Sequence, residues 1–286
     1  MKFFLGSLGN RFTNQELIMN AVVEADKLGF DGALMPDHYM WGEREWGRRR
    51  PDDYVTLESW ITLTYLAGKT ERIRLGTLVT PIPLRHPSIL AKMLSTLDVL
   101  SKGRVVLGVG AGWSKEEFEG YSEWDEPKVR VDKTIEGLEL MMKLWTQDEV
   151  THEGKYYKAK TAVLEPKPIQ KPYPQLLFGG NGDRMLKLAG KYADICYLLS
   201  NIPPQVYDER IRKILKAAAK FNRAGKLAFM GGDLSTRVPY HFKLYAKKVE
   251  LAIEKGASYF LTSFPRDEEF INSIRRFATE LIPSFK

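Results

Sequence analysis

Asp37 and His38 are the neighbouring side chains in this sequence that are best suited to chemistry. They stand in MPDHYMW (35–41), directly after a short apolar run. The imidazole of histidine exchanges protons near neutral pH, although a single histidine is more often structural. Asp37 could also form a glycosidase-type carboxylate pair with Glu116, but nothing in the sequence sets their separation. The functional interpretation therefore depends on where the fold places Asp37 and His38.

Two glycine-rich stretches, GVGAG (108–112) and GGNGD (179–183), are candidates for holding a ligand. Glycine allows backbone N–H groups to approach a ligand closely, and the N-terminus of a helix attracts phosphate. Each stretch also has a plainer interpretation. Asp183 could simply cap the helix that follows it, and GVGAG matches only the first part of a dinucleotide fingerprint. Together, the two stretches predict a site for an extended phosphorylated cofactor.

No other class of catalytic centre is indicated. His86, His152 and His241 lack the spacing of metal ligands, so no metal site is predicted. The sequence contains no serine or cysteine nucleophile motif. Its single cysteine, Cys196, lies in an apolar run, which excludes an internal disulfide framework and suits a reducing cytoplasm.

These candidate residues follow short apolar runs, which are typical of strands buried on both faces. Eight runs are predicted strands: 3–8, 32–36, 73–79, 105–109, 176–178, 195–199, 227–230 and 259–262. Eight segments with helical periodicity alternate with them: 14–28, 57–68, 87–100, 130–145, 183–192, 204–221, 242–255 and 268–282. In the first of these, Thr13 or Asn14 is the expected cap and Gly29 the stop.

Strict alternation of strands and helices predicts an α/β fold with a parallel sheet. An open doubly wound sheet competes with a closed barrel, but the count of eight and the length of 286 residues favour a (β/α)8 TIM barrel. The longest departure, about 147–174, contains a predicted hairpin around Glu153 and Gly154. It is interpreted as an insertion after helix 4 within a single domain spanning residues 1–286. Chemistry in such a barrel belongs where strands run into helices.

The third predicted strand ends abruptly. The stretch LGTLVTPIPLRHPS (75–88) places Pro81, Pro83 and Pro87 within seven residues, and proline lacks the backbone N–H that a strand requires. Either this is an ordinary strand-to-helix turn, or the strand end is shaped to hold a ligand.

The net charge is +7, from 43 Lys and Arg against 36 Asp and Glu. The basic residues are scattered over the predicted helices and form no stripe with interleaved aromatics, so nucleic-acid binding is not expected. No apolar run approaches the ~20 residues that span a bilayer, and the N-terminal apolar stretch is too short for a signal peptide. A cytoplasmic protein with no membrane partner is therefore predicted. The cluster Arg48-Arg49-Arg50 is either a solvated loop or a guide for an anionic ligand.

Residues 75–119, LGTLVTPIPLRHPSILAKMLSTLDVLSKGRVVLGVGAGWSKEEFE, carry a family resemblance together with PDH (36–38) and EPKPIQKPYPQLLFGGNGDRMLKLAGKYADI (165–195). They resemble the bacterial luciferase-like superfamily and, within it, the branch that depends on the deazaflavin coenzyme F420. The resemblance covers about residues 1–200 strongly and the remainder weakly. The combination of motifs is specific, whereas no single motif is. It implies a barrel of eight βα units, in agreement with the count above.

The resemblance also gives the third strand a role. It implies a bulge with a non-proline cis peptide bond between Thr77 and Leu78, with Leu78 directed at the face of the flavin ring. Asp37 and Thr80 are expected to contact the deazaflavin head group. The remaining cofactor contacts are expected along the ribityl chain and in the phosphate region, from Ala111, Gly112, Gly179, Gly180, Gly182 and Asp183.

For the substrate side, the resemblance matches His38 to a histidine that acts on protons in some members. Trp41 and Trp113 are expected in the substrate pocket. Sugar-phosphate dehydrogenases of the family carry a catalytic glutamate where this chain has Trp113 and an asparagine where it has Glu116. This departure argues against sugar-phosphate oxidation and for a more apolar, aromatic pocket.

The predicted function is F420-dependent hydride transfer between C5 of the deazaflavin and a small organic substrate, either an alcohol–carbonyl pair or an activated alkene. The acidic glutamate tail of F420 suits the basic balance of the chain. Two alternatives stay open: an FMN-dependent luciferase-like monooxygenase that uses O2, and a non-catalytic flavin-binding protein. We expect a homodimer or a dimer-based homo-oligomer.

Overall fold

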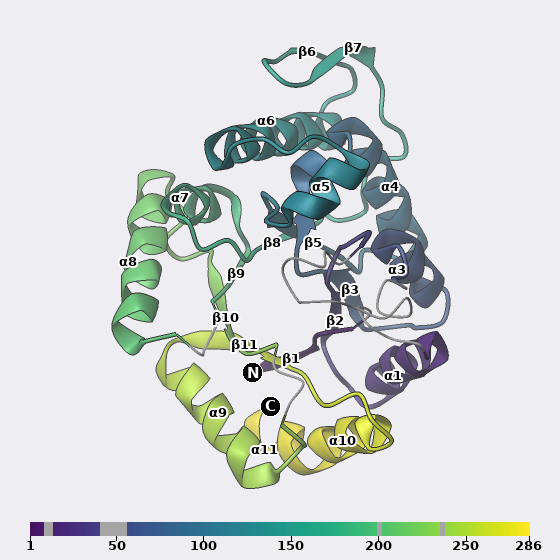
Figure 1. Ribbon diagram of the computed structural model, residues 1–286, viewed down its shortest axis with the longest axis vertical. Helices are drawn as coiled ribbons and strands as arrows, with labels where there is room; N and C mark the ends of the chain where they lie inside the picture. Colours follow the sequence, from purple (N-terminus) through teal and green to yellow (C-terminus); the bar gives the residue numbers. More distant parts are fainter. Residues whose placement is uncertain (9–13, 41–55, 199–201, 235–237) are drawn as a thin grey trace.

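Eight parallel strands close into a barrel (Figure 1). The structure, a computed structural model, describes residues 1–8, 14–40, 56–198, 202–234 and 238–286. Each strand pairs with the next around the barrel, and the last pairs with the first: β1 (Lys2–Leu5), β2 (Gly32–Met35), β3 (Arg74–Thr77), β5 (Val105–Gly110), β8 (Gln175–Phe178), β9 (Ile195–Tyr197), β10 (Ala228–Gly232) and β11 (Ala257–Thr262). This closure confirms the (β/α)8 TIM barrel over an open sheet.

Helices surround the barrel on its outer side (Figure 1). The eight predicted helices are present: α1 (Gln15–Lys27), α3 (Ser59–Ala67), α4 (Pro87–Leu100), α6 (Pro127–Thr146), α7 (Asp183–Tyr192), α8 (Pro204–Lys220), α9 (Phe242–Glu254) and α10 (Phe270–Arg276). Asn14 caps α1, because its side chain accepts a hydrogen bond from the N–H of Leu17 (3.1 Å). Gly29 follows the end of α1 with φ of 86°, as expected of a glycine stop.

Three segments refine the predicted pattern. The insertion forms an antiparallel hairpin of β6 (Val150–Glu153) and β7 (Lys158–Ala162), as predicted. The last helix does not run unbroken to 282. It passes through a π-helical turn (Phe277–Leu281) into α11 (Ile282–Phe285), because Pro283 has no N–H to donate to the preceding turn. A further short helix, α5 (Lys115–Tyr121), follows β5, where only a strand-to-helix turn was expected.

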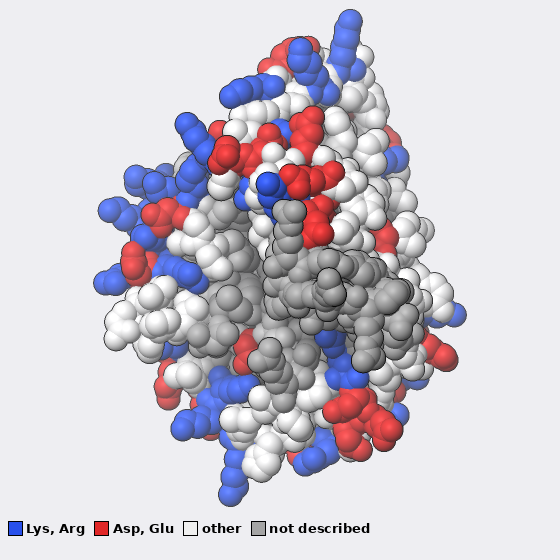
Figure 2. All heavy atoms as spheres, in the orientation of Figure 1, with Lys and Arg blue, Asp and Glu red and all other residues white. Residues whose placement is uncertain are grey.

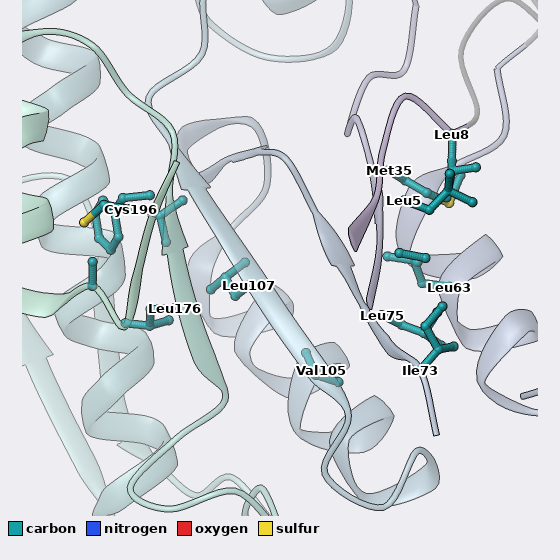
Figure 3. Close-up of a cluster of buried hydrophobic side chains, with 14 of the residues drawn as sticks. Leu5, Leu8, Met35, Leu63, Ile73, Leu75, Val105, Leu107, Leu176 and Cys196 are labelled. Atoms are coloured by element: carbon teal, nitrogen blue, oxygen red, sulfur yellow. The ribbon is translucent and has the colours of Figure 1, made fainter. Parts of the chain in front are cut away.

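The core lies in two layers separated by the barrel wall. Alternate strand residues point inward, such as Phe4, Leu34 and Val106, and form one cluster inside the barrel. Their neighbours point outward and pack against the helices. Figure 3 shows this outer layer, in which strand residues such as Leu5 and Leu75 lie close to Leu63 of α3. Packing on both faces fixes the strands, so their carboxyl ends form a rigid rim.

The third strand is interrupted by a bulge. Pairing between β3 and β5 stops at Gly76, and pairing with β5 resumes at β4 (Thr80–Pro81). Three residues, 77–79, therefore lie opposite only two residues of β5, which is the arrangement of a β-bulge. The bulge that the family resemblance implies is present, but the non-proline cis bond joins Leu78 to Val79 and not Thr77 to Leu78. The N–H of Leu78 still donates to the carbonyl of Met35 (2.8 Å), so regular pairing with β2 continues one residue further.

Among the described residues, no helix has the combination of length and apolar composition that crossing a bilayer requires.

Candidate active site

A cavity of about 480 Å³ opens at the carboxyl ends of the barrel strands. Its lining comes from the last residues of β5 and β9, from the segments that follow β2, β3, β5, β8 and β10, and from the start of α6. Most of the predicted site residues meet there: His38, Leu78, Ala111, Gly112, Trp113, Gly179, Gly180 and Gly182. This volume is within the range of ~300–1,000 Å³ that is usual for small-molecule sites. The cavity is therefore the place at the strand ends where the predicted chemistry could occur.

The bulge supplies an apolar wall of this cavity. Leu78 and Val79 both line it and are half-buried. Two neighbouring strands make room for the bulge with glycine. A Cβ atom on Gly110 would lie 2.4 Å from the side chain of Val79, and one on Gly179 would lie 3.1 Å from it. The abrupt end of the third strand is thus a shaped surface, since glycines on the next two strands interlock with it.

Asp37 and Thr80 lie behind this wall and do not line the cavity. The two carboxylate oxygens of Asp37 each accept a hydrogen bond from Arg85 (2.8 Å), and the hydroxyl of Thr80 donates to the same carboxylate (2.7 Å). Thr77 and Trp60 complete the network through the Thr80 hydroxyl, at 2.9 and 3.1 Å. Thr77 is equally buried, so none of these three residues lines the cavity, and their direct contact with a deazaflavin head group stays a prediction. Arg85, which the sequence did not single out, turns Asp37 inward.

The same arginine carries further contacts. It forms an ion pair with Glu58 and lies over the ring of Tyr39, with 4.6 Å between the guanidinium carbon and the ring centroid. Burial lowers the pKa of Arg85, but the charge and hydrogen bonds of Asp37 outweigh burial and raise its pKa overall. Arg85 thus stays charged and anchors the loop after β2, which carries His38, to the segment after the bulge.

His38 is held by a buried carboxylate. Its Nδ1 lies 2.9 Å from Oε2 of Glu117, whose other oxygen accepts a hydrogen bond from the N–H of Tyr39 (2.6 Å). Only 8% of His38 and 1% of Glu117 are exposed. A carboxylate at Nδ1 favours the tautomer with the proton on Nδ1, in which Nε2 carries the lone pair. The ring of Trp113 meets the imidazole edge-on, with 5.4 Å between centroids.

The sequence analysis considered Glu116 but missed Glu117. A signal for Glu117 was present, since Ser114 and Glu117 have the S-x-x-E spacing of a capping box at the start of a helix. The side chain of Ser114 does accept from the N–H of Glu117 (3.4 Å) at the start of α5. Recognising that helix would have placed Glu117 in its first turn beside the strand end.

The glycine loop forms another edge of the cavity, at the N-terminus of α7. Gly182 is the N-cap residue of α7, and no side chain caps its first turn. The alternative that Asp183 caps the helix is wrong. Its side chain points outward, 67% exposed, and pairs with Lys213 (2.7 Å), which lowers the pKa of Asp183. The first-turn N–H groups of α7 thus have no side-chain acceptor among the described residues, which suits an anionic ligand.

Two further polar groups line the cavity and were missed from the sequence. Nε of Arg130 and the hydroxyl of Tyr197 are buried, and within the described part of the chain neither has a hydrogen-bond partner. Because buried polar groups are nearly always satisfied, these two are available as hydrogen-bond partners to a polar ligand in the cavity. Neither carried a sequence signal, because Arg130 begins a predicted helix and Tyr197 belongs to an apolar strand run.

Trp41 and the cluster of Arg48, Arg49 and Arg50 lie outside the described residues, so their predicted roles are not addressed by the structure. Over the described ranges, no group of three or more His, Cys, Asp or Glu side chains is arranged to hold a metal ion.

Comparison with known families gives one match over most of the chain. The family model for luciferase-like monooxygenases matches residues 11–235. An F420-dependent glucose-6-phosphate dehydrogenase from Microbacterium testaceum is 32% identical over 212 residues, which is 74% of this chain and 60% of that protein. The enzyme of the same name from Nakamurella multipartita is 32% identical over 217 residues, with 76% and 61% coverage. The match thus spans about three fifths of the length of these relatives.

Solved structures with the same fold include an F420-dependent secondary alcohol dehydrogenase in complex with an F420–acetone adduct. Its TM-score is 0.82 at 22% identity, with both chains covered completely. The monooxygenase RslO1 from Streptomyces bottropensis has a TM-score of 0.77 at 21% identity, also over both chains in full. At this level of identity the similarity establishes the barrel fold.

Proposed function

Because this chain belongs to the luciferase-like monooxygenase family, we propose that it is an oxidoreductase dependent on coenzyme F420, which transfers a hydride between C5 of the deazaflavin and a small organic substrate. The observation that carries the proposal is the composition of one cavity. The same 480 Å³ cavity is lined by an apolar bulge, an uncapped helix N-terminus and a buried histidine–carboxylate pair. The curated relatives named as F420-dependent enzymes support the choice of cofactor.

The residues present fit such a cofactor. Leu78 and Val79 offer an apolar surface for a planar ring, and Gly110 and Gly179 leave room for the bulge that carries them. The first turn of α7 at the glycine loop, and the unsatisfied Nε of Arg130 in the lining of the same cavity, suit a phosphate group. When bound, the deazaflavin would supply the hydride chemistry. Ala111 and Gly112, which line the cavity, are available to the chain that joins ring to phosphate.

His38 is assigned the proton transfer. Reduction of a carbonyl needs a proton as well as a hydride, and oxidation of an alcohol releases one. With the Nδ1 proton held toward Glu117, Nε2 is the atom through which His38 would give or take that proton. Glu117 is a positioning residue in this scheme, because it sets the tautomer and stabilises the imidazolium without touching the substrate.

The substrate class follows from the wall beside His38. Trp113 is 49% exposed and packs edge-on against His38. An indole cannot take the role of the glutamate that the family resemblance implies at this position in sugar-phosphate dehydrogenases. The proposed substrate is therefore a small, weakly polar alcohol, carbonyl compound or activated alkene, although the curated relatives are named for glucose 6-phosphate.

The direct test is titration of the purified protein with F420 and with FMN, followed by absorbance and fluorescence. Assays of F420 oxidation and reduction against secondary alcohols, ketones and enones would follow. Selective binding of F420 with turnover of one substrate class supports the proposal. Binding of FMN with substrate-dependent O2 consumption would instead identify a monooxygenase, and binding without turnover a flavin-binding protein.

Substitution of Gly182 tests whether the N-terminus of α7 binds the phosphate of the cofactor. A Cβ at this residue would have no atom within 4 Å, so the fold should accept a side chain there. We expect Gly182→Asp to raise or maintain the melting temperature, because aspartate caps α7, and to weaken F420 binding by at least about tenfold, because it competes with the phosphate for the same N–H groups. Gly182→Ala is the matched control and should bind nearly normally. Equal F420 affinity of the Asp and Ala variants would show that the phosphate does not bind at the N-terminus of α7.

The positioning role of Glu117 has its own readout. Glutamine at residue 117 can still accept from the N–H of Tyr39 but would turn its amide toward Nδ1 of His38, which favours the opposite tautomer. We expect Glu117→Gln to lower turnover on the order of 10²-fold and to change the 15N NMR signature of the His38 ring. Glu119→Gln, on the exposed side of the same helix, should change neither. Lost activity with an unchanged His38 tautomer would contradict the assigned role.

The oligomeric state and cellular location remain predictions. Exposed apolar side chains on α3 and α4, among them Ile61, Ile89 and Leu100, favour self-association. Light scattering on the purified protein would test the expected homodimer or dimer-based assembly.

A further inference from the structure

A second cavity, of about 790 Å³, lies outside the barrel along α7 and α8. Six basic side chains line it in two rows, Arg184, Lys187 and Lys191 from α7 and Lys213, Lys216 and Lys220 from α8. Both rows have successive spacings of three and four residues, so each keeps to one face of its helix. We call this feature the basic groove. Figure 2 shows Lys and Arg side chains gathered over these two helices at the upper left.

The positive charge of the basic groove is only partly compensated. Arg184 pairs with Asp132, Lys191 with Glu139 and Lys213 with Asp183. Over the described ranges, no ion pair involves Lys187, Lys216 or Lys220. In total, α7 and α8 carry eight Lys and Arg residues against three Asp and Glu. Facing rows of like charge repel each other, so an anionic ligand between them would be stabilised.

The basic groove and the candidate active site meet at the glycine loop. Gly182 lines the active-site cavity, and the next residue, Asp183, lines the groove. The α8 helix reaches this loop from the groove side. Arg210 donates to the side chain of Asn181 (2.8 Å), and Lys213 donates to Asp183 (2.7 Å). A ligand with its phosphate at the N-terminus of α7 could therefore continue into the groove without crossing the barrel.

We propose that the basic groove is a subsite for the acidic tail of the cofactor. The groove would then favour binding of F420, which carries glutamate residues beyond its phosphate, over binding of FMN, whose phosphate ends the molecule. This inference rests on the proposed function. From Asp183 to Lys191 the groove is about 12 Å long, at ~1.5 Å per helical residue. That length matches roughly three or four residues of an extended chain. Each carboxylate of such a tail would pass between the two rows of cations.

The test compares F420 with its tail-less form, a deazaflavin whose side chain ends at the phosphate. Lys187, Lys216 and Lys220 are changed together to glutamate in the full-length protein. All three are exposed and lie outside the active-site cavity. The matched control changes three exposed lysines far from the groove in sequence, Lys69, Lys102 and Lys160, which have no ion pair among the described residues. Dissociation constants are measured by fluorescence at low and high ionic strength, with circular dichroism as the check on folding.

The groove triple variant should bind F420 roughly tenfold to hundredfold more weakly at low salt, and the difference should shrink at high salt. Its affinity for the tail-less form should be unchanged, and the control triple variant should bind both forms normally. Equal weakening of both forms, or of neither, would overturn the groove assignment while leaving the proposed function intact. If the unaltered protein binds neither deazaflavin, the proposed function fails, and the groove assignment fails with it.

Discussion

Replacement of His38 with alanine should lower turnover by about 10²–10⁴-fold, the usual contribution of a general acid–base residue, while cofactor affinity changes little. The reason is geometric. Glu117 holds His38 through Nδ1, beside the pocket side chain of Trp113, and the proposed cofactor contacts come from other strands. Steady-state rates with a ketone or secondary alcohol, set beside F420 dissociation constants, measure the two effects separately.

The control is His241→Ala, because His241 is exposed and its side chain does not cap α9. That variant should retain full activity. A parallel fall in turnover and in cofactor affinity for His38→Ala would make His38 a packing residue. Undiminished turnover would exclude it from proton transfer, and another group on the cavity wall would have to be sought.

Loss of the Arg85 guanidinium should be among the most destabilising single changes in the chain. Arg85→Met removes the partner of Asp37, whose side chain is fully buried, and leaves a carboxylate with only the Thr80 hydroxyl. Breaking a buried ion pair from one side typically costs about 3–5 kcal/mol. Urea denaturation of the variant, at constant pH and ionic strength, gives the change in the free energy of unfolding.

Two further variants identify the cause of that loss of stability. The double variant Arg85→Met with Asp37→Asn removes the uncompensated charge and should recover a large part of the stability. Arg276→Met breaks an exposed pair with Glu280 and should cost at most about 1 kcal/mol. If Arg85→Met were no worse than Arg276→Met, the network behind the bulge would contribute little to stability.

The strands and helices were predictable because their signals are local. Short branched runs and helical periodicity are visible within windows of a few residues, and Asn14, Gly29 and Pro87 mark helix ends through their own chemistry. The glycine loop after β8 and His38 after β2 were found in the same way. Their convergence then followed from the rule that strand ends share one rim.

What could not be predicted depends on contacts between distant residues. Asp37 meets Arg85 across 48 residues, and that pairing withdraws the carboxylate from the cavity. His38 meets Glu117 across 79 residues, although the choice between Glu116 and Glu117 was open to a closer inspection of the helix cap. The cis bond was placed from the family resemblance alone and was one residue off, because no local sequence signal distinguishes Thr77–Leu78 from Leu78–Val79.

The close packing of glycines against the bulge restricts which residues of this cavity can be substituted during evolution. A Cβ atom on Gly108 would lie 2.0 Å from the carbonyl oxygen of Thr77, and one on Gly110 would lie 2.4 Å from the side chain of Val79. Selection for a new substrate therefore has little freedom on the strand side of the cavity. Freedom remains at Trp113 and Leu234, which line the cavity from beyond the strand ends and are 49% and 37% exposed. A library for directed evolution should vary those two residues and leave the glycines untouched.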